Sequence, residues 1–341
     1  MLKQRRSIVG LDIGSSAIKA LEITQDKYDY IITAYAQIDV PGAQAIRDAV
    51  SDLFRSGGFH TKRVATAVSG KSVIFRYINM PQMPDDSLKS AIKFEADKYI
   101  PFDVEEVEID TQKLMDIPGA EGIDPESKVL LVAAKKSVIE DQAQVLTDLS
   151  LQPVSIGVES FAIGNAYELN DIVSPSLQDA DHTVALIDVG ASKTCINILR
   201  NNISCFAREV PMGGQDITNA ITRRFGLEPY EAEALKRDPQ DQMHDVQEAV
   251  AHVLEDLGNE INLSFDFFEN QFDGEVQEIF LSGGAVLLPF LEESLERIFE
   301  KKTRVWNPIE GLKVKADNVD IDALNHMAPQ LAVAVGLAAQ P

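Results

Sequence analysis

The chain has 341 residues, of which 45% are hydrophobic, and its 31 basic against 54 acidic side chains give a net charge of −23. This length allows two domains with a core each, and the charge argues against nucleic-acid binding because most of the surface repels phosphate. Cys195 and Cys205 flank a predicted strand and are expected to be buried apolar residues in a reducing compartment. The first apolar run stops at Asp12, too early for a secretory leader or a membrane span, so we expect a cytoplasmic protein without direct membrane insertion.

Alternating apolar and β-branched residues predict strands in the first part of the chain, and a segment with helical period follows the third strand. Gly57 and Gly58 provide a suitable end for that helix, because glycine readily adopts the conformation that closes a helix. Pro81 and Pro84 cannot continue a central strand and therefore mark a boundary. The elements expected before this boundary are strands at 7–13, 17–24 and 30–38, a helix at 42–56, and strands at 63–69 and 73–79.

An inserted subdomain is predicted at about 82–152, within a first domain of residues 1–169. The polar stretch 170–181 that follows this domain is expected to be a linker. The elements predicted in this region are a helix at 85–99, a strand at 105–116, a Pro/Gly loop at 117–126, a strand at 128–135, a helix at 137–150, a strand at 153–158 and a helix to about 169.

The second half repeats the order of three strands and a helix and is predicted to be a second domain, residues 182–341. Its longest helix, at 242–272, belongs to a smaller subdomain at about 219–274 and carries an apolar stripe that we assign to core packing. The final helix at 328–339 lacks a charged face, so we expect it to be buried against the sheet and not to lie on a membrane. The other expected elements are strands at 183–189, 193–199 and 202–210, a helix entered at 213–214, a strand at 276–282 and a helix at 287–300.

One pattern occurs in both halves: an apolar strand, an aspartate, an apolar residue, a glycine, two small residues and a second strand. The first copy contains Asp12 and Gly14, and the second contains Asp188 and Gly190, so the copies are 188 − 12 = 176 residues apart. A single pattern of this kind is explained by a plain β-turn. Two copies followed by the same order of elements favour two hairpins that face one phosphate group across a cleft.

The residue types in these hairpins suit a polyphosphate bound with a cation. Gly14 and Gly190 are expected to adopt positive φ angles and to let backbone N–H groups approach phosphate oxygens. Asp12 and Asp188 end apolar strands, where hydrated Mg²⁺ bridging to the phosphates would compensate their charge. Lys19 can place a positive charge on the β- or γ-phosphate. Hydroxyl donors are available from Ser15, Ser16, Ser192 and Thr194.

Two further glycine turns are candidates for nucleotide binding. Gly213 and Gly214 precede a helix whose free N–H groups and dipole favour anions, although an ordinary glycine entry to a helix explains them as well. The turn formed by Gly283, Gly284 and Ala285 follows an apolar strand, and a flat base could lie on this side-chain-free backbone. A plain strand-to-helix turn is the alternative.

Glu233 and Lys236 lie three residues apart on a predicted short helix and therefore share one face. They could contact a ribose and a base. An exposed ion pair on a helix surface, worth about 0.3–0.5 kcal/mol, is the alternative for these two residues.

These motifs resemble the superfamily of sugar kinases, heat-shock chaperones and actin. The first phosphate loop of that superfamily is similar to residues 12–19, and its adenosine loop is similar to residues 282–285. Its second phosphate loop is similar to residues 188–194, a match that adds Ala191 and Lys193 to the candidate nucleotide-binding residues.

Within this superfamily, the sequence resembles FtsA and PilM proteins at residues 208–218 and 232–236. Residues 93–102 and 105–110 resemble the PilM family of type IV pilus assembly proteins in particular. The resemblance implies an α/β, actin-like ATPase fold with ribonuclease H-like duplicated domains and an FtsA/PilM-type inserted subdomain. It also implies ATP and Mg²⁺ in the cleft between the domains.

The partner implied by the resemblance is the cytoplasmic amino-terminal peptide of a PilN-type membrane protein, held between the first and inserted subdomains. Such a scaffold would lie at the inner membrane through its protein partners, and self-association stays open. Hydrolysis in the superfamily needs a polar residue that orients water, and Glu159 is the candidate. Glu159 could equally cap the helix that follows it.

Two other functions stay open from the sequence. A small-molecule kinase of the same superfamily would need a carboxylate that binds the acceptor, and the sequence offers no good candidate. An FtsA-like filament or division protein would need an amphipathic carboxy-terminal helix, which residues 332–341 do not form. Whether the protein hydrolyses ATP is not decided by the sequence.

Overall fold

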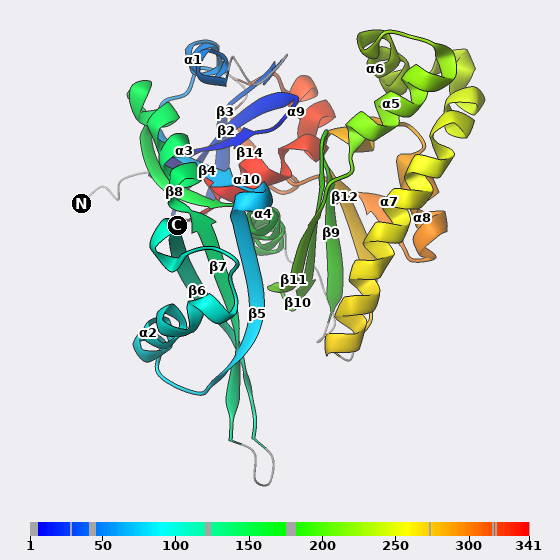
Figure 1. The fold of residues 1–341 in the computed structure, drawn as a ribbon. Coiled ribbons are helices and arrows are strands. Elements are labelled where there is room, and N and C mark those ends of the chain that lie inside the picture. Colours follow the sequence, from blue (N-terminus) through cyan, green and yellow to red (C-terminus); the bar gives the residue numbers. More distant parts are fainter. Residues whose placement is uncertain are drawn as a thin grey trace.

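Two α/β lobes lie side by side in the computed structural model, and a smaller sheet projects from the first lobe (Figure 1). The structure describes residues 6–27, 29–40, 46–119, 124–174, 182–272, 274–315, 317 and 319–340. None of the helices in these ranges is long and apolar enough to cross a membrane.

The first lobe contains a six-stranded sheet whose first three strands form an antiparallel meander. The next two strands join this meander in parallel. The helix α1 (Ile46–Ser56) ends where the glycine pair predicts, because Gly57 N donates to Leu53 O at 2.9 Å and Gly58 has φ +66°. The sheet order is β14-β3-β2-β1-β4-β8, with β1 (Arg6–Ile13), β2 (Ala17–Asp26), β3 (Asp29–Asp39), β4 (Arg63–Val68), β8 (Gln152–Val158) and β14 (Lys313–Val314).

The second lobe repeats this arrangement in its five-stranded sheet. Three antiparallel strands are again followed by two parallel strands, so the duplication visible in the sequence is a duplication of topology. The order is β11-β10-β9-β12-β13, with β9 (Thr183–Val189), β10 (Thr194–Arg200), β11 (Ile203–Val210), β12 (Glu278–Ser282) and β13 (Thr303–Val305).

Helices α4 (Glu159–Val173) and α10 (Ala332–Ala338) pack against each other between the two sheets (Figure 1). One continuous hydrophobic cluster joins them to residues of both sheets. The contact is close, since a Cβ on Gly336 would lie 1.7 Å from Ala162 O. The prediction that the final helix is buried agrees with the structure, in which all residues of α10 are buried.

Helix α4 extends into the stretch expected to be a linker, and the remainder of that stretch, residues 175–181, lies outside the described residues. Leu169 is buried, and Asn170 Nδ2 donates to the carbonyl oxygens of Pro308 and Glu310 at 3.0 Å each. These tertiary contacts stabilise a last helical turn that its polar local sequence does not reveal.

The carboxy-terminal region returns to the first lobe, although the sequence placed residues 182–341 in the second domain. Strand β14 pairs with β3, with Lys313 opposite Ile31. Helix α9 (Ile321–Met327) then leads into α10, which contacts β1, β2 and β4. Strands β13 and β14 and helix α9 were not predicted from the sequence, because each is too short to show a period of its own.

The inserted region contains a three-stranded sheet of order β5-β7-β6 covered by α2 (Asp85–Glu95). Its first strand begins at Val73, upstream of the expected limit at residue 82. The last helix of the expected insert, α3 (Lys136–Asp148), buries Leu146 in the core of the first lobe. The strands are β5 (Val73–Pro81), β6 (Val107–Ile117) and β7 (Glu126–Lys135).

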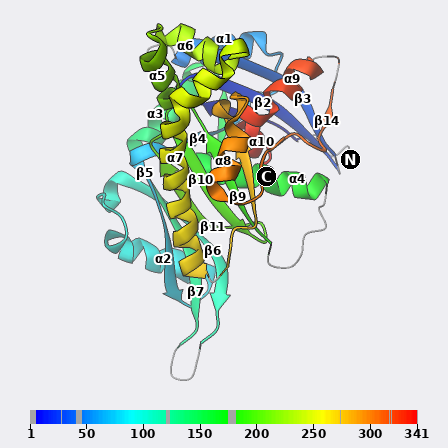
Figure 2. The ribbon, with the colours of Figure 1, turned by 90° about the vertical axis from the view of Figure 1, so that its right-hand side faces the viewer.

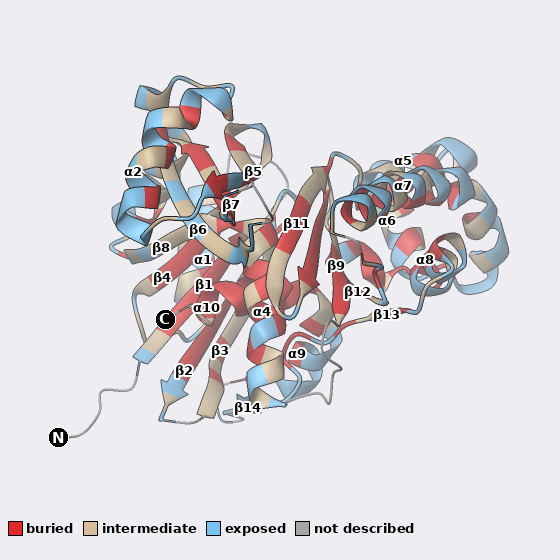
Figure 3. Ribbon diagram, turned by 90° about the horizontal axis from the view of Figure 1, so that it is seen from below, coloured by how far each residue is buried: buried red, intermediate tan, exposed pale blue. Residues whose placement is uncertain are grey.

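Helices α7 and α8 pack against the second sheet, α5 packs against α7, α6 packs against α5, and the outer faces of these four helices are exposed (Figure 3). The longest, α7, runs along the flank of the sheet (Figure 2). Its apolar stripe is core packing as predicted, with Val250, Ile261 and Phe268 fully buried. The four are α5 (Gly214–Phe225), α6 (Pro229–Arg237), α7 (Met243–Phe272) and α8 (Leu291–Phe299).

We expect Gly336→Ala to lower the free energy of unfolding by about 2 kcal/mol or more, because the new methyl group would force α4 and α10 apart. Denaturant unfolding measures this change. Gly274→Ala is the matched control, since a Cβ there would lie 3.7 Å from its nearest neighbour, Arg200 Nη1. Equal stability of the two variants would contradict the close helix contact.

Candidate functional site

The first hairpin joins β1 to β2 and places Lys19 directly opposite Asp12 in the strand register. The Lys19 Nζ atom lies 2.5 Å from Asp12 Oδ2, and both side chains are largely buried. Burial alone would lower the pKa of Lys19, yet the nearby carboxylates raise it above its ordinary value. These carboxylates belong to Asp12, Asp188 and Glu159. The structure therefore brings the first hairpin, the second hairpin and the start of α4 into one charged cluster.

The two hairpins have the same local geometry. Gly14 N donates to Ala17 O at 3.1 Å, and Gly190 N donates to Lys193 O at 2.9 Å. Neither glycine has a positive φ angle, so the expected left-handed conformation is wrong for both. Glycine is required for a steric reason. A Cβ on Gly14 would lie 2.8 Å from Ala17 O, and a Cβ on Gly190 would lie 2.9 Å from Lys193 O.

Asp188 lies at the end of β9 and accepts a hydrogen bond of 2.8 Å from Ser282 Oγ. Burial raises the pKa of Asp188 to about 6. The charge of Lys19 and the Ser282 hydrogen bond oppose this rise, whereas the carboxylates of Asp12 and Glu159 add to it. A nearby cation would relieve this repulsion, which makes the pair of aspartates suitable neighbours for hydrated Mg²⁺. Among the described residues, no three His, Cys, Asp or Glu side chains are arranged to hold a metal ion directly.

Gly213 and Gly214 lie against the second hairpin, but their amides are not free. Gly214 N donates to Gly190 O at 2.8 Å, and Gln215 N donates to Ala191 O at 2.7 Å. Gly213 N donates to Asp216 Oδ2 at 2.9 Å. The expectation that this helix start presents free N–H groups to an anion is therefore wrong, and the loop supports the hairpin instead.

Glu233 and Lys236 form a partly buried pair, with 2.5 Å between Lys236 Nζ and Glu233 Oε2. Lys236 Nζ also donates to Gly214 O and Thr218 Oγ1, so it ties α6 to α5. Burial lowers the pKa of Lys236, and its pairing with Glu233 opposes that change. The alternative of an exposed ion pair is thus wrong. A Cβ on Gly214 would lie 3.4 Å from Lys236 Nζ and 3.5 Å from Ala285 Cβ, so these three residues meet at one place.

The glycine turn after β12 completes this side of the site. Gly283 has φ +96°, and a Cβ there would lie 2.5 Å from Val189 O in the second hairpin. Its N–H donates to Pro329 O at 2.8 Å. A 3-10 turn at Gly284–Leu287 follows, and α8 begins only at Leu291. The residues predicted around the second hairpin therefore do lie together.

Glu159 is the first residue of α4 but does not cap it, since the helix shows no side-chain cap. Its carboxylate accepts a hydrogen bond of 2.7 Å from Ser69 Oγ and lies 2.6 Å from Lys193 Nζ. Burial raises the pKa of Glu159, and the charge of Lys193 opposes this rise. The capping alternative is wrong, and Glu159 faces the charged cluster.

Three residues of this cluster, Ser69, Gly70 and Glu209, were not predicted from the sequence. Ser69 binds Glu159, and Glu209 accepts from Gly70 N at 2.9 Å and lies 3.4 Å from Lys193 Nζ. The duplication could have revealed Ser69 and Gly70, because this pair stands at the end of β4 as the pair Ser282 and Gly283 stands at the end of the corresponding β12. Nothing local in β11 singles out Glu209.

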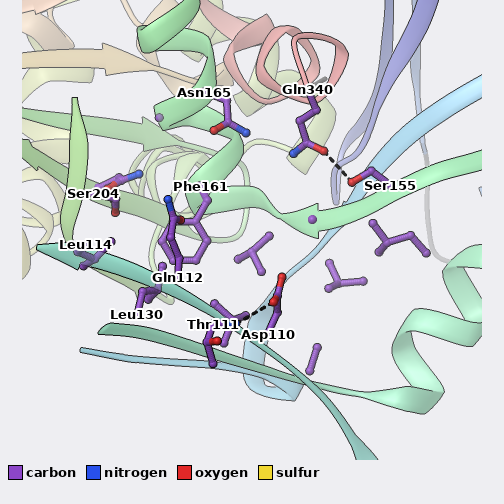
Figure 4. A pocket seen from close by; sticks show the side chains of 18 of the residues that line it. Asp110, Thr111, Gln112, Leu114, Leu130, Ser155, Phe161, Asn165, Ser204 and Gln340 are labelled. Atoms are coloured by element: carbon purple, nitrogen blue, oxygen red, sulfur yellow. Dashed lines mark hydrogen bonds between the residues drawn. The ribbon is translucent and has the colours of Figure 1, made fainter. Parts of the chain in front are cut away.

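A cavity of about 790 Å³ lies away from the hairpins, between the inserted sheet and the two lobes. Strands β6, β7, β8, β10 and β11 line it together with α4 (Figure 4). Phe161 and Leu130 contribute apolar surface. The charged residues of its lining are Glu108, Asp110 and Glu168, and none of the described lining residues is Lys or Arg.

The family model described as type IV pilus assembly protein PilM matches residues 10–340. The chain belongs to the PilM family. Among solved structures, the PilM-PilN type IV pilus biogenesis complex is similar, with 28% identity, a TM-score of 0.85 and coverage of 99% of this chain and 100% of that chain. MreB5 of Spiroplasma citri bound to ADP is 10% identical with a TM-score of 0.52, covering 97% of this chain and 94% of that chain.

The cell division protein FtsA of Bacillus subtilis (strain 168) is 22% identical over 257 residues, which cover 67% of this chain and 57% of FtsA. The chain thus spans less than two thirds of that relative. PilM family membership and the shared actin-like ATPase fold confirm the resemblance stated from the sequence. The fold is of a nucleotide-binding kind, and the paired hairpins lie where its two lobes meet.

In the nucleotide-free protein we expect Asp188→Asn to raise the melting temperature by a few degrees near neutral pH. The pKa of the folded state, about 6, exceeds the ordinary 3.8, so the folded protein holds an extra proton between these values. The penalty of this carboxylate therefore grows as pH rises through that window and is complete above it. Asparagine keeps an acceptor for Ser282 and removes the charge.

Thermal unfolding at about pH 8 and about pH 4 tests this, and the gain should be larger at the higher pH. Asp97→Asn, on an exposed turn of the insert, is the control and should change little. A gain that is the same at both pH values would contradict the assigned cause.

Proposed function

We propose that the protein is an ATP-binding scaffold of type IV pilus assembly that holds the amino-terminal peptide of a PilN-type membrane protein. Whole-chain membership of the PilM family carries this proposal, together with similarity to the PilM-PilN type IV pilus biogenesis complex. The protein would lie at the cytoplasmic side of the inner membrane through such partners.

The paired hairpins are the proposed ATP site. Backbone amides of the turns and the hydroxyl groups after Gly14 and Gly190 would face the phosphates, with Lys19 as the positive charge between them. Asp12 and Asp188 would hold Mg²⁺ through water, and Mg²⁺ supplies the charge neutralisation that phosphate binding needs here. The four carboxylates of the cluster outnumber its two lysines, which supports the need for a cation.

The glycine turn at Gly283 and Gly284 would lie under the adenosine, beside Glu233 and Lys236. Glu159 would orient a water molecule if ATP is hydrolysed, because its carboxylate faces the charged cluster from the start of α4. Such a site uses positioning and charge, with no covalent intermediate on the protein.

The cavity beside the inserted sheet is the proposed peptide site. Its mixture of apolar and acidic lining suits a segment that carries both apolar and basic side chains. The acidic lining residues Glu108, Asp110 and Glu168 are exposed, so a basic side chain can reach them.

We expect Lys19→Met to weaken Mg-ATP binding by about tenfold or more, because the loss leaves the carboxylates of the cluster uncompensated beside the phosphates. Isothermal titration calorimetry measures the affinity, and thermal unfolding verifies that the variant folds. Lys19→Arg keeps the charge and should retain more affinity. Lys89→Met, on the exposed side of α2, is the control. Unchanged affinity in Lys19→Met would argue against this nucleotide site.

We expect Asp110→Lys to weaken binding of a synthetic amino-terminal peptide of the PilN-type partner by about tenfold, since a positive charge replaces a negative one in the cavity. Fluorescence anisotropy with labelled peptide measures the affinity at two salt concentrations. Asp97→Lys makes the same charge change on the insert outside the cavity and should bind normally. Equal weakening by both variants would show a general charge effect and exclude this peptide site.

A further inference from the structure

The connection from the first lobe into the inserted sheet passes through the charged cluster. It consists of Ser69 and the 3-10 turn Gly70–Ser72, and we name it the Ser69 turn. On one side, Ser69 Oγ donates to Glu159 Oε1 at 2.7 Å, at the start of α4. On the other, Gly70 N donates to Glu209 Oε2 at 2.9 Å, in the second lobe. The turn is therefore attached to both lobes at once.

Lys193 closes this set of contacts into a ring. Its Nζ atom lies 2.6 Å from Glu159 Oε2 and 3.4 Å from Glu209 Oε1. All three side chains are at most about a quarter exposed, at 24%, 16% and 18% in that order. The backbone of Lys193 belongs to the second hairpin, where its carbonyl oxygen accepts from Gly190 N. A phosphate that enters the hairpin meets the ammonium group on which both carboxylates depend.

The other end of the turn leads directly to the cavity. Strand β5 begins at Val73, and Val73 pairs with Ala134 of β7. Ala134, Val132 and Leu130 of β7 all line the cavity. Gly70 has φ +79°, and a Cβ there would meet no atom within 4 Å, so the turn has space to move.

A second set of hydrogen bonds joins the same regions. The hydroxyl oxygen of Tyr77 in β5 lies 3.2 Å from Ser204 Oγ, and Ser204 Oγ donates to Asn197 Oδ1 at 2.7 Å. Asn197 Nδ2 donates to Ser160 O at 2.7 Å, next to Glu159. Ser204 and Asn197 line the cavity, so its wall is bonded both to the insert and to the start of α4.

We infer that the ring of Ser69, Gly70, Glu159, Lys193 and Glu209 transmits nucleotide occupancy of the hairpins to the cavity of the inserted sheet. The inference rests on the proposed function, since it takes the hairpins as the nucleotide site and the cavity as the peptide site. Phosphate competes with Glu159 and Glu209 for Lys193, which loosens the Ser69 turn and shifts β5 and β7. Because linkage is reciprocal, the peptide changes nucleotide affinity by the same factor.

Glu209→Gln tests the ring, because it removes one charge and keeps an oxygen acceptor for Gly70 N. Affinity of the synthetic PilN-type peptide is measured with and without saturating Mg-ATP, and Mg-ATP affinity with and without saturating peptide. For the unaltered protein we expect the peptide affinity to change on addition of Mg-ATP, and the Mg-ATP affinity to change on addition of peptide, by one common coupling factor of about five or more. In Glu209→Gln this factor falls below about two, and because the factor is a ratio of two affinities measured in the same variant, a change in the affinity for either ligand alone does not alter it.

Glu278→Gln is the matched control, since Glu278 is a similarly buried carboxylate of the second lobe that pairs with Lys302 and Arg304 outside the ring. It retains the full factor. Hydrogen exchange of the backbone N–H groups in the segment 70–81 gives a second readout. Mg-ATP changes the exchange rates of this segment in the unaltered protein, and this change is lost in Glu209→Gln. Thermal unfolding verifies that both variants fold.

A full coupling factor in Glu209→Gln overturns the ring and leaves the proposed function standing. Equal peptide affinities with and without nucleotide in the unaltered protein also overturn the ring and leave the proposed function standing. Failure of the unaltered protein to bind either ligand alone overturns the proposed function, and the ring with it.

Discussion

The close packing of α4 against α10 is the constraint on which the other features depend. Helix α4 follows β8 of the first sheet and contacts β10 and β11 of the second sheet, whereas α10 contacts β1, β2 and β4 of the first sheet. The two helices meet almost backbone to backbone at Gly336 and Ala162. One hydrophobic cluster then covers both lobes. Because the lobes share this core, the hairpins at the ends of β1 and β9 lie within electrostatic reach of each other.

The site that results is dominated by charge at close range. Asp12, Asp188 and Glu159 lie around Lys19, and because they have little contact with water, their negative charges repel one another strongly. Such an arrangement of buried carboxylates is costly without a bound cation. The support for the second hairpin comes from neighbouring loops, whose amides and glycines pack on its carbonyl oxygens.

The inserted sheet is placed so that a change in this site can reach a distant surface. Its first strand starts directly after a turn that is bonded to both lobes, and its second strand forms the wall of an acidic and apolar cavity. A connection of this kind can relate two binding sites, provided that each ligand prefers one arrangement of the turn.

The sequence by itself determined the duplicated topology, the two Asp-x-Gly hairpins and the long core helix α7, because these depend on local periodicity and on glycine at tight turns. The actin-like superfamily was indicated by resemblance to known families. Only the tertiary structure decided that Gly214 N and Gln215 N already bond to the second hairpin, and that Glu159 and Glu209 share Lys193. It also decided that the carboxy-terminal strand and helix return to the first lobe. Each of these features joins residues far apart in the chain, and a short-range pattern carries no information on which distant groups will satisfy a buried charge or backbone amide.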